Sequence, residues 1–139
     1  MPPPPVPEVR RPARLTLAHR CIQFVSDRLV QQVVDGTKTA SVVRLQDVDV
    51  AEDDYNDALV VGACYDVYDS SRIRRATLRI VAMELCRWDD IPERLWRGEG
   101  NRSADEFRSD HRGYFNDPTS DFEFVAYYFE QVHDAGEGE

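Results

Sequence analysis

The sequence has almost no lysine: Lys38 is the only one, and the other sixteen of the 17 basic residues are arginine. It also has no long hydrophobic run, since no apolar stretch approaches the roughly 20 residues that a membrane-spanning helix needs. The three cysteines, Cys21, Cys64 and Cys86, are widely spaced and form no C-x-x-C pair, which excludes the common zinc and redox motifs. We therefore expect reduced core thiols, no membrane partner, and neither a metal nor another cofactor.

Positive charge is scarce overall. Aspartate and glutamate number 26 against 17 lysines and arginines, and the net charge is -9. Proteins that bind duplex DNA or long RNA usually carry an excess of basic residues, because those residues neutralise the phosphates. Duplex DNA is therefore not an expected partner, and any contact with nucleic acid should be local. The arginines gather in residues 72–79 and 94–112, which leaves room for a positive site in an acidic molecule.

A chain of 139 residues is long enough for one domain with a proper core. The first residues, MPPPPVPEVRRPARL, place proline where a signal peptide would have its apolar stretch, so we expect a cytoplasmic protein. We predict a disordered proline-rich tail over residues 1–15, a single domain over 16–133 and a disordered acidic tail over 134–139.

Local patterns predict a small α+β domain. A helix is expected over residues 26–36, with Ser26 as its N-cap and Gly36 after its last turn. Segments with strand-like composition and alternation cover 39–45, 58–69, 75–88 and 121–132, and two short helices cover 89–96 and 103–115. This order of elements fits a curved, mostly antiparallel sheet with flanking helices.

Lys38 is the first candidate for chemistry. Arginine cannot lose its proton in a protein, whereas a desolvated lysine can have a lowered pKa and act as a base. Thr39 and Ser41 stand two residues apart on a predicted strand, so their hydroxyls share one face and can form a polar pocket wall. The alternative is an ordinary solvated turn followed by the polar face of a strand.

Glu99 and His111 are the second candidates. Glu99 lies between Gly98 and Gly100, where the backbone can bend sharply and present the carboxylate shortly before a helix start at Ser103. His111 can act as a general acid or base near neutral pH. The alternatives are an exposed turn glutamate and a histidine that is hydrogen-bonded within the packing.

Three motifs together resemble the ASCH (activating signal cointegrator homology) domain family over about residues 21–132. They are DGTKTAS at 35–41, LWRGEGNRSADEFRSDHRGYF at 95–115 and FEFVAYYFE at 122–130. The family is similar in fold to PUA domains, which implies a small PUA-like β-barrel with flanking helices and a cleft for a nucleoside or an RNA base. Some small bacterial members are amidohydrolases that remove the acyl group from N4-acetylcytidine, and another is described as a ribonuclease.

The resemblance implies a catalytic set of Lys38, Ser41 and Glu99. Lys38 would take a proton from the Ser41 hydroxyl or from a water, and Glu99 would protonate the leaving amine or bind the exocyclic nitrogen. No metal is needed for this chemistry. The expected substrate-binding residues are Thr39, Arg44, Trp96, Asn101, His111 and Tyr114, with Thr39 or a backbone amide holding the oxyanion and an aromatic ring stacking on the base.

The chain departs from the family pattern at three places. An arginine often found five residues after the lysine is Val43 here, with Arg44 one place later. The usual Gly-Asp before the second strand reads Gly62-Ala63, and the frequent EGEGD reads RGEGN at 97–101.

Two alternatives to the amidohydrolase stay open. A non-catalytic module would capture an RNA base or nucleotide, with Lys38 and Arg44 contacting phosphate or carbonyl oxygens. A ribonuclease would cleave RNA with the same residues. In each case the expected partner is a modified pyrimidine nucleoside or an RNA base.

Overall fold

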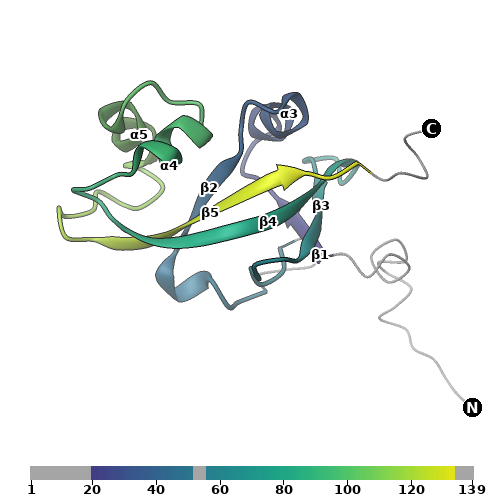
Figure 1. Cartoon of the computed structure of the whole chain (residues 1–139), viewed down its shortest axis with the longest axis horizontal. Helices are drawn as coiled ribbons and strands as arrows, with labels where there is room; N and C mark the ends of the chain where they lie inside the picture. Colours follow the sequence, from purple (N-terminus) through teal and green to yellow (C-terminus); the bar gives the residue numbers. More distant parts are fainter. Residues whose placement is uncertain (1–19, 52–55, 134–139) are drawn as a thin grey trace, which may run out of the picture.

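The computed structural model describes residues 20–51 and 56–133, so both predicted tails lie outside the described residues. The described elements are β1 (Arg20–Gln23), α3 (Asp27–Asp35), β2 (Ala40–Arg44), the 3-10 turn η1 (Leu45–Asp47), β3 (Cys64–Tyr68), β4 (Arg74–Arg87), α4 (Glu93–Gly98), α5 (Ala104–His111) and β5 (Glu123–Gln131). The α+β class predicted from the sequence is confirmed (Figure 1). Within the described ranges, no helix is long and apolar enough to cross a membrane.

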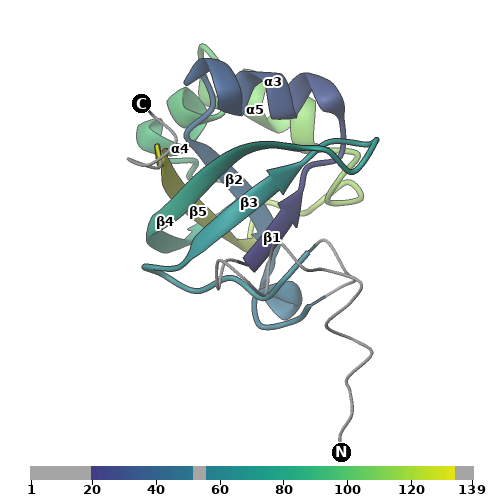
Figure 2. The same cartoon turned by 90° about the vertical axis from the view of Figure 1, so that its right-hand side faces the viewer.

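The five strands form one curled, half-barrel sheet in the order β1-β3-β4-β5-β2 (Figure 2). The β1–β3 pair is parallel and the other three pairs are antiparallel, which confirms the expected curved, mostly antiparallel sheet. The sequence did not predict β1, because a four-residue strand carries too little alternation to be recognised. The sheet is not closed, so β1 and β2 are its two edges.

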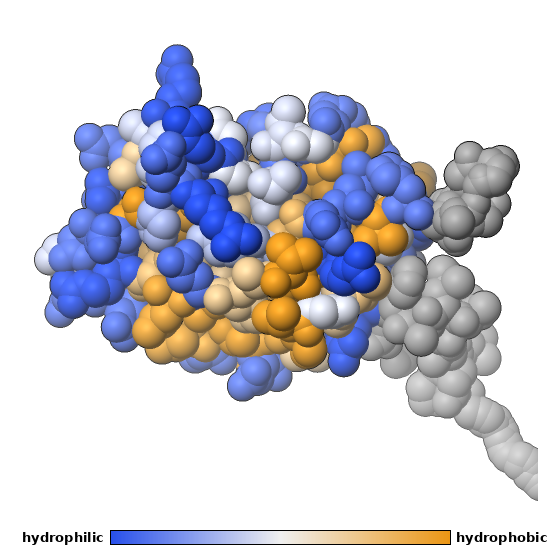
Figure 3. Space-filling model, in the orientation of Figure 1, coloured by the Kyte–Doolittle hydropathy of each residue, from blue (hydrophilic) through white to orange (hydrophobic). Residues whose placement is uncertain are grey.

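Helices pack on both faces of the sheet and bury two hydrophobic clusters. Along β5, Phe124, Ala126 and Tyr128 face the cluster beneath α4 and α5, and Tyr127 and Phe129 face the cluster beneath α3. The predicted sharing of one face by Phe122, Phe124, Ala126 and Tyr128 is confirmed, with Phe122 half-buried against the first cluster. On the surface, polar side chains cover much of the helical part, and apolar ones gather below the β4–β5 pair (Figure 3).

A β-bulge in β4 lets one strand serve both clusters. The register with β5 shifts between Ile80, which pairs with Phe129, and Ala82, which pairs with Tyr128. The extra residue reverses the alternation, so Ile80 packs in the α3 cluster and Ala82 against the α4–α5 cluster. Both positions are even-numbered, and without the bulge they would face the same way.

The predicted caps of α3 are present. The Ser26 side chain accepts a hydrogen bond from the Leu29 amide, and Gly36 ends the helix in the left-handed conformation with a φ of 82°. The amide of Thr37 then bonds back to the Gln32 carbonyl, which is the six-to-one bond of a Schellman motif. This ending turns the chain directly from α3 into Lys38 and the edge strand β2.

The strand predicted over residues 58–69 is shorter than expected, because β3 begins only at Cys64. In the segment before β3, the Ala58 carbonyl and the Val60 amide bond to the Tyr65 hydroxyl and not to a neighbouring strand. The hydroxyl donates to the Ala58 carbonyl at 2.6 Å and accepts from the Val60 amide at 2.8 Å. A buried tyrosine on the strand thus satisfies main-chain groups of the preceding loop.

Candidate active site

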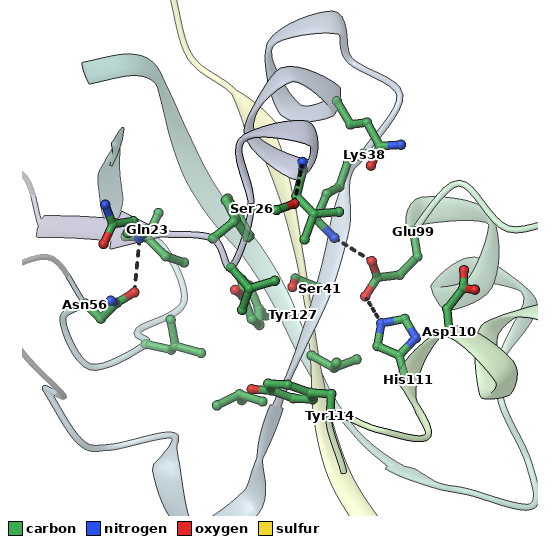
Figure 4. A pocket seen from close by; sticks show the side chains of 18 of the residues that line it. Gln23, Ser26, Lys38, Ser41, Asn56, Glu99, Asp110, His111, Tyr114 and Tyr127 are labelled. Atoms are coloured by element: carbon green, nitrogen blue, oxygen red, sulfur yellow. Dashed lines mark hydrogen bonds and ion pairs between the residues drawn. The ribbon is translucent and has the colours of Figure 1, made fainter. Parts of the chain in front are cut away.

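A cavity of about 720 Å³ lies between the two edge strands of the sheet, the start of α3 and the α4–α5 connection. Seven of the nine site residues expected from the sequence line it: Lys38, Ser41, Arg44, Glu99, Asn101, His111 and Tyr114. Figure 4 shows Lys38, Glu99 and His111 in a row on one wall, with a hydrogen bond from Lys38 to Glu99, an ion-pair contact between Glu99 and His111, and Ser41 and Tyr127 nearby. Residues distant in the sequence therefore converge on one polar site.

Lys38 is buried, with 2% of its surface exposed, although it follows a tight turn. After the Schellman ending of α3, the Lys38 amide donates to the Gln32 carbonyl at 3.1 Å. This bond fixes the Lys38 backbone, from which the side chain enters the cavity wall. The Nζ atom donates to the Ala40 carbonyl at 2.7 Å and to Glu99 Oε1 at 2.5 Å. The single lysine is thus held at a defined point of the site and is not an ordinary solvated turn residue.

Two glycines with different functions place Glu99 opposite Lys38. Gly98 brings the last turn of α4 against β2, where its carbonyl accepts the Thr39 amide at 2.7 Å. Gly100 has a φ of 86° and donates to the Arg97 carbonyl, while the next amide bonds to Trp96, so α4 also ends in a Schellman motif. Glu99 is the C-cap residue of this helix end.

His111 lies behind Glu99. Its Nδ1 atom is 2.9 Å from the Phe107 carbonyl, and its Nε2 atom is 3.2 Å from Glu99 Oε2. A carbonyl only accepts, so Nδ1 carries a proton and donates it. The short Nε2–Oε2 contact is then a hydrogen bond only if a second proton lies between these two atoms. The imidazole thus lies between the Phe107 carbonyl and the second oxygen of Glu99.

The ionisation of the pair follows from its burial. Burial lowers the pKa of Lys38 below its ordinary 10.5, and the attraction of Glu99 opposes this only in part. For Glu99, burial alone would raise the pKa, but Lys38 and His111 outweigh it and hold the pKa below 4.5. Glu99 is therefore a carboxylate at neutral pH, and Lys38 is the member of the pair whose proton is easier to remove than usual.

Ser41 and Tyr127 are cross-strand neighbours in the β2–β5 pair, and both line the cavity. Burial raises the pKa of Tyr127, while a hydrogen bond with Ser41 acts in the opposite direction. The phenol therefore stays neutral and can share a proton with the Ser41 hydroxyl. This contact orients the Ser41 hydroxyl, and the residue opposite Ser41 on β5 is uncharged.

Thr39 and Trp96 do not line the cavity, which corrects two of the expected binding residues. The Thr39 side chain is exposed, and its Oγ1 lies beside Gly98 on the side where α4 approaches β2. Trp96 packs against the α4–α5 cluster, with the Arg97 guanidinium 5.0 Å from its ring centroid. The structure therefore places these two side chains away from the cavity wall that the other seven share.

Phe24 and Gln32 are two of the cavity residues that the sequence reasoning missed. The Phe24 ring lines the cavity with its centroid 5.5 Å from Lys38 Nζ, so it offers an aromatic face beside the lysine. Gln32 places a buried side-chain oxygen in the wall near the same lysine. Phe24 precedes the predicted N-cap Ser26, but no local signal indicates that its ring turns into a cavity.

Arg44 and Tyr114 contact each other at the cavity wall. The guanidinium of Arg44 lies 4.8 Å from the Tyr114 ring centroid and donates to the Tyr114 carbonyl. Tyr114 is 38% exposed, so this pair is the more accessible part of the lining. Across residues 20–51 and 56–133, no three His, Cys, Asp or Glu side chains gather to hold a metal ion.

The sequence matches the family model for the ASCH domain over residues 20–132, which is most of the chain. The chain belongs to the ASCH domain family. The family expected from the three motifs is thus confirmed. A search of curated proteins gives no match.

Solved structures share the ASCH fold of this chain at low sequence identity. An ASCH domain from Lactobacillus crispatus JV V101 superimposes with a TM-score of 0.67 and 14% identity, covering 87% of this chain and 86% of that one. Protein EF3133 from Enterococcus faecalis V583 superimposes with a TM-score of 0.61 and 22% identity, covering 90% of this chain and 91% of that one. A mutant of ZmASCH from Zymomonas mobilis gives 0.54 and 13% identity, covering 81% and 70%. At these identities the similarity establishes the fold.

The lone lysine of this ASCH domain can be titrated directly. Labelling lysine with ¹³C at Cε gives one side-chain signal, whose chemical shift follows the charge on Lys38. We expect a pKa below 10.5 in the wild type, because burial disfavours the ammonium. In Glu99→Gln the pKa should fall further, because the carboxylate that attracts the ammonium is gone. A wild-type value at or above 10.5 would contradict the assignment.

The same pKa shifts determine how stability depends on pH. Between the folded pKa of Lys38 and 10.5, the unfolded chain binds more protons than the folded one, so stability from this residue rises with pH. Glu99 contributes stability above about pH 4.5, and this contribution is lost as the pH falls through the lower pKa that Glu99 has in the folded protein.

Proposed function

We propose that this ASCH domain protein is an amidohydrolase that removes the acyl group from an N4-acylated cytosine nucleoside or a related modified nucleoside. The observation that carries the proposal is the buried Lys38–Glu99 pair, whose nitrogen and oxygen lie 2.5 Å apart on the wall of a cavity large enough for a nucleoside. Amide hydrolysis needs a base to activate the nucleophile and an acid for the leaving nitrogen. A lysine with a lowered pKa can perform both steps in turn.

Lys38 is the proposed base. Besides its bond to carbon, the Nζ atom has three tetrahedral positions. Two of them point at hydrogen-bond acceptors, the Ala40 carbonyl and Glu99. In the neutral amine, both of these bonds can be kept with the two remaining N–H groups, and the lone pair is left to accept a proton. Lys38 lines the cavity, so this lone pair serves the nucleophile on that side.

The nucleophile is the Ser41 hydroxyl or a water in the same position. In the first case the serine oxygen attacks the acyl carbon, the C–N bond breaks, and water then hydrolyses the acyl-serine. In the second case water attacks the acyl carbon directly and no acyl-enzyme forms. Mass spectrometry of the protein during turnover distinguishes the two routes, because only the first adds an acyl group to the chain.

The backbone of β2 supplies the proposed oxyanion donor in place of Thr39. The Phe129 amide donates to the Thr39 carbonyl, so the backbone groups of residue 39 face β5. In an antiparallel pair, backbone groups face the partner strand at every second residue, so the amide of Val42 points away from β5. The Val42 side chain packs in the α4–α5 cluster, yet the residue also lines the cavity. In the proposed mechanism its N–H, directly after Ser41, donates to the acyl oxygen as that oxygen gains charge.

Glu99 acts as the charge partner of Lys38 in this mechanism. Its lowered pKa keeps it ionised, which makes it a poor direct acid for the leaving amine. Lys38 gains a proton from the nucleophile, becomes an ammonium stabilised by Glu99, and returns the proton to the leaving nitrogen. The products are the free amine of the nucleoside and a carboxylic acid.

Turnover of N4-acetylcytidine tests the proposal. We expect the purified protein to release cytidine and acetate in equal amounts, with a rate that rises with pH as Lys38 loses its proton. Chromatography quantifies the nucleoside and an enzymatic assay quantifies the acetate. Heat-denatured protein is the control for spontaneous hydrolysis.

Absence of release from N4-acetylcytidine and from other N4-acylcytidines would reject the hydrolase. Retention of RNA with a salt-dependent affinity, without nucleoside turnover, would then favour the binding module. RNA cleavage that disappears in a Lys38 variant, purified alongside the wild type to control for contamination, would favour the ribonuclease.

A further inference from the structure

The Asn101 side chain is held in one orientation by two carboxylates. Its Nδ2 atom donates to Asp110 Oδ2 at 2.9 Å and lies 3.5 Å from Glu106 Oε1. The pKa of Glu106 is lowered by hydrogen bonds from the backbone and side chain of Arg102, so this carboxyl is ionised and can only accept. If the oxygen and nitrogen of the Asn101 side chain were swapped, its oxygen would face the carboxylate oxygens without a proton between them. The nitrogen therefore faces the carboxylates, and the oxygen faces elsewhere.

The Asn101 oxygen has no partner. Within the described residues, Oδ1 is buried and makes no hydrogen bond, and the residue lines the cavity. Gln32 Oε1, on the wall near Lys38, is buried and unpartnered in the same way. Buried acceptors are normally satisfied, and leaving one unpaired destabilises the folded protein. Together with Glu99 Oε2, which also makes no hydrogen bond in the described residues, these oxygens favour a ligand that brings hydrogen-bond donors.

The position of Asn101 relative to Glu99 is fixed by the end of α4. Glu99 is the C-cap, Gly100 occupies the left-handed position, and the Asn101 amide bonds to the Trp96 carbonyl at 2.8 Å. Both side chains line the same cavity. The free acceptor thus lies in the same rigid turn as the carboxylate that supports the proposed base.

We infer that Asn101 Oδ1 accepts a hydrogen bond from the exocyclic N–H of the bound base, and that Asn101 thereby selects an amino-bearing pyrimidine over a keto pyrimidine. This inference rests on the proposed function, which brings that nitrogen to Lys38 and Glu99. The nitrogen carries an N–H both in the acylated substrate and in the amine product. A uracil-type carbonyl at the same point would place two acceptors together, with no donor between them.

The identity of residue 101 supports this assignment. A carboxylate there would face Asp110 and Glu106 and would repel both. An amide satisfies them with its nitrogen and leaves its oxygen able to accept a hydrogen bond. Asparagine at this position thus combines attachment to two acids with recognition of a donor, which aspartate cannot do.

Ligand binding to the wild type and to Asn101→Ala tests the inference. Cytidine, uridine and 2′-deoxycytidine are compared by calorimetry. We expect the wild type to bind cytidine about tenfold or more tightly than uridine, and Asn101→Ala to reduce this ratio to about threefold or less. Gln31→Ala is the matched control, because the Gln31 amide bonds Asp35 and Arg75 outside the cavity, and it should keep the wild-type ratio.

Base analogues test the same point without a variant, in case Asn101→Ala does not fold. N4-methylcytidine keeps one exocyclic N–H and should bind the wild type, whereas N4,N4-dimethylcytidine has none and should bind as weakly as uridine. Equal binding of the two analogues would overturn the inference. A loss of discrimination against 2′-deoxycytidine in Asn101→Ala, with the cytidine preference kept, would also overturn it, since it would assign Oδ1 to a ribose hydroxyl.

The remaining outcomes separate the two proposals. Turnover of N4-acetylcytidine without a cytidine preference rejects the role of Asn101 and leaves the hydrolase intact. A cytidine preference that depends on Asn101, without turnover, rejects the hydrolase and keeps the amino-selective site. Absence of binding by every pyrimidine, together with absence of turnover, rejects both.

Discussion

Lys38→Met is expected to reduce turnover of N4-acetylcytidine by about 10³-fold, because it removes the proposed base while filling its buried space. Methionine has a similar length and is apolar, which suits a side chain that is 2% exposed. The rate of cytidine release at saturating substrate is the measurement. Circular dichroism and a denaturant titration establish that the variant is folded.

Lys38→Arg separates a base from a simple positive charge. Arginine keeps the charge beside Glu99 but cannot give up its proton. If Lys38 transfers protons, this variant should lose activity as severely as Lys38→Met. Activity within about tenfold of the wild type would show that the residue acts as a fixed cation, and the base would have to be sought elsewhere. The comparison also tests why this arginine-rich sequence has a lysine at this one place.

Gly98→Ala is expected to have the largest effect on the placement of the site. An added Cβ would lie 2.6 Å from the Ala40 Cβ and 3.1 Å from Thr39 Oγ1, which is too close for the first pair. The Ala40 Cβ is attached to the backbone of β2 and cannot rotate away, so α4 must move outward and take Glu99 from Lys38. We expect a loss of about 1–3 kcal/mol in the free energy of unfolding, together with a loss of turnover.

Two further variants control this experiment. Gly113→Ala adds a Cβ that meets nothing within 4 Å, and it should leave both stability and turnover near the wild-type values. Gly98→Ala combined with Ala40→Gly removes the closest contact and should restore part of the turnover. If Gly98→Ala alone is as stable and as active as the wild type, close approach of α4 to β2 is not what holds Glu99 in place.

Local signals were sufficient to predict α3 and the apolar face of β5. The caps at Ser26 and Gly36 depend on hydrogen bonds and backbone angles within one turn, so they can be recognised in the sequence. The family resemblance supplied the pairing of Lys38 with Glu99, which are 61 residues apart. No local pattern relates positions at such a separation.

Features determined by tertiary contacts could not be predicted. The bulge between Ile80 and Ala82 depends on which helices cover each face of the sheet. Thr39 was placed on the pocket face by strand alternation, but α4 lies against it and β2 begins only at the next residue. The late start of β3 depends on the Tyr65 hydroxyl, which satisfies main-chain groups of the preceding loop. In each case a long-range contact overrides a short pattern.

The opening of the sheet between β1 and β2 has a consequence for how this protein can change. Cavity-lining side chains come from the edge strands β1 and β2, from the start of α3 and from the α4–α5 connection, and they project from the sheet without taking part in its backbone hydrogen bonds. A substitution at Asn101 or Arg44 therefore alters the surroundings of a ligand without breaking a strand pair. The scaffold itself tolerates extensive change, since a structure only 14% identical shares its architecture.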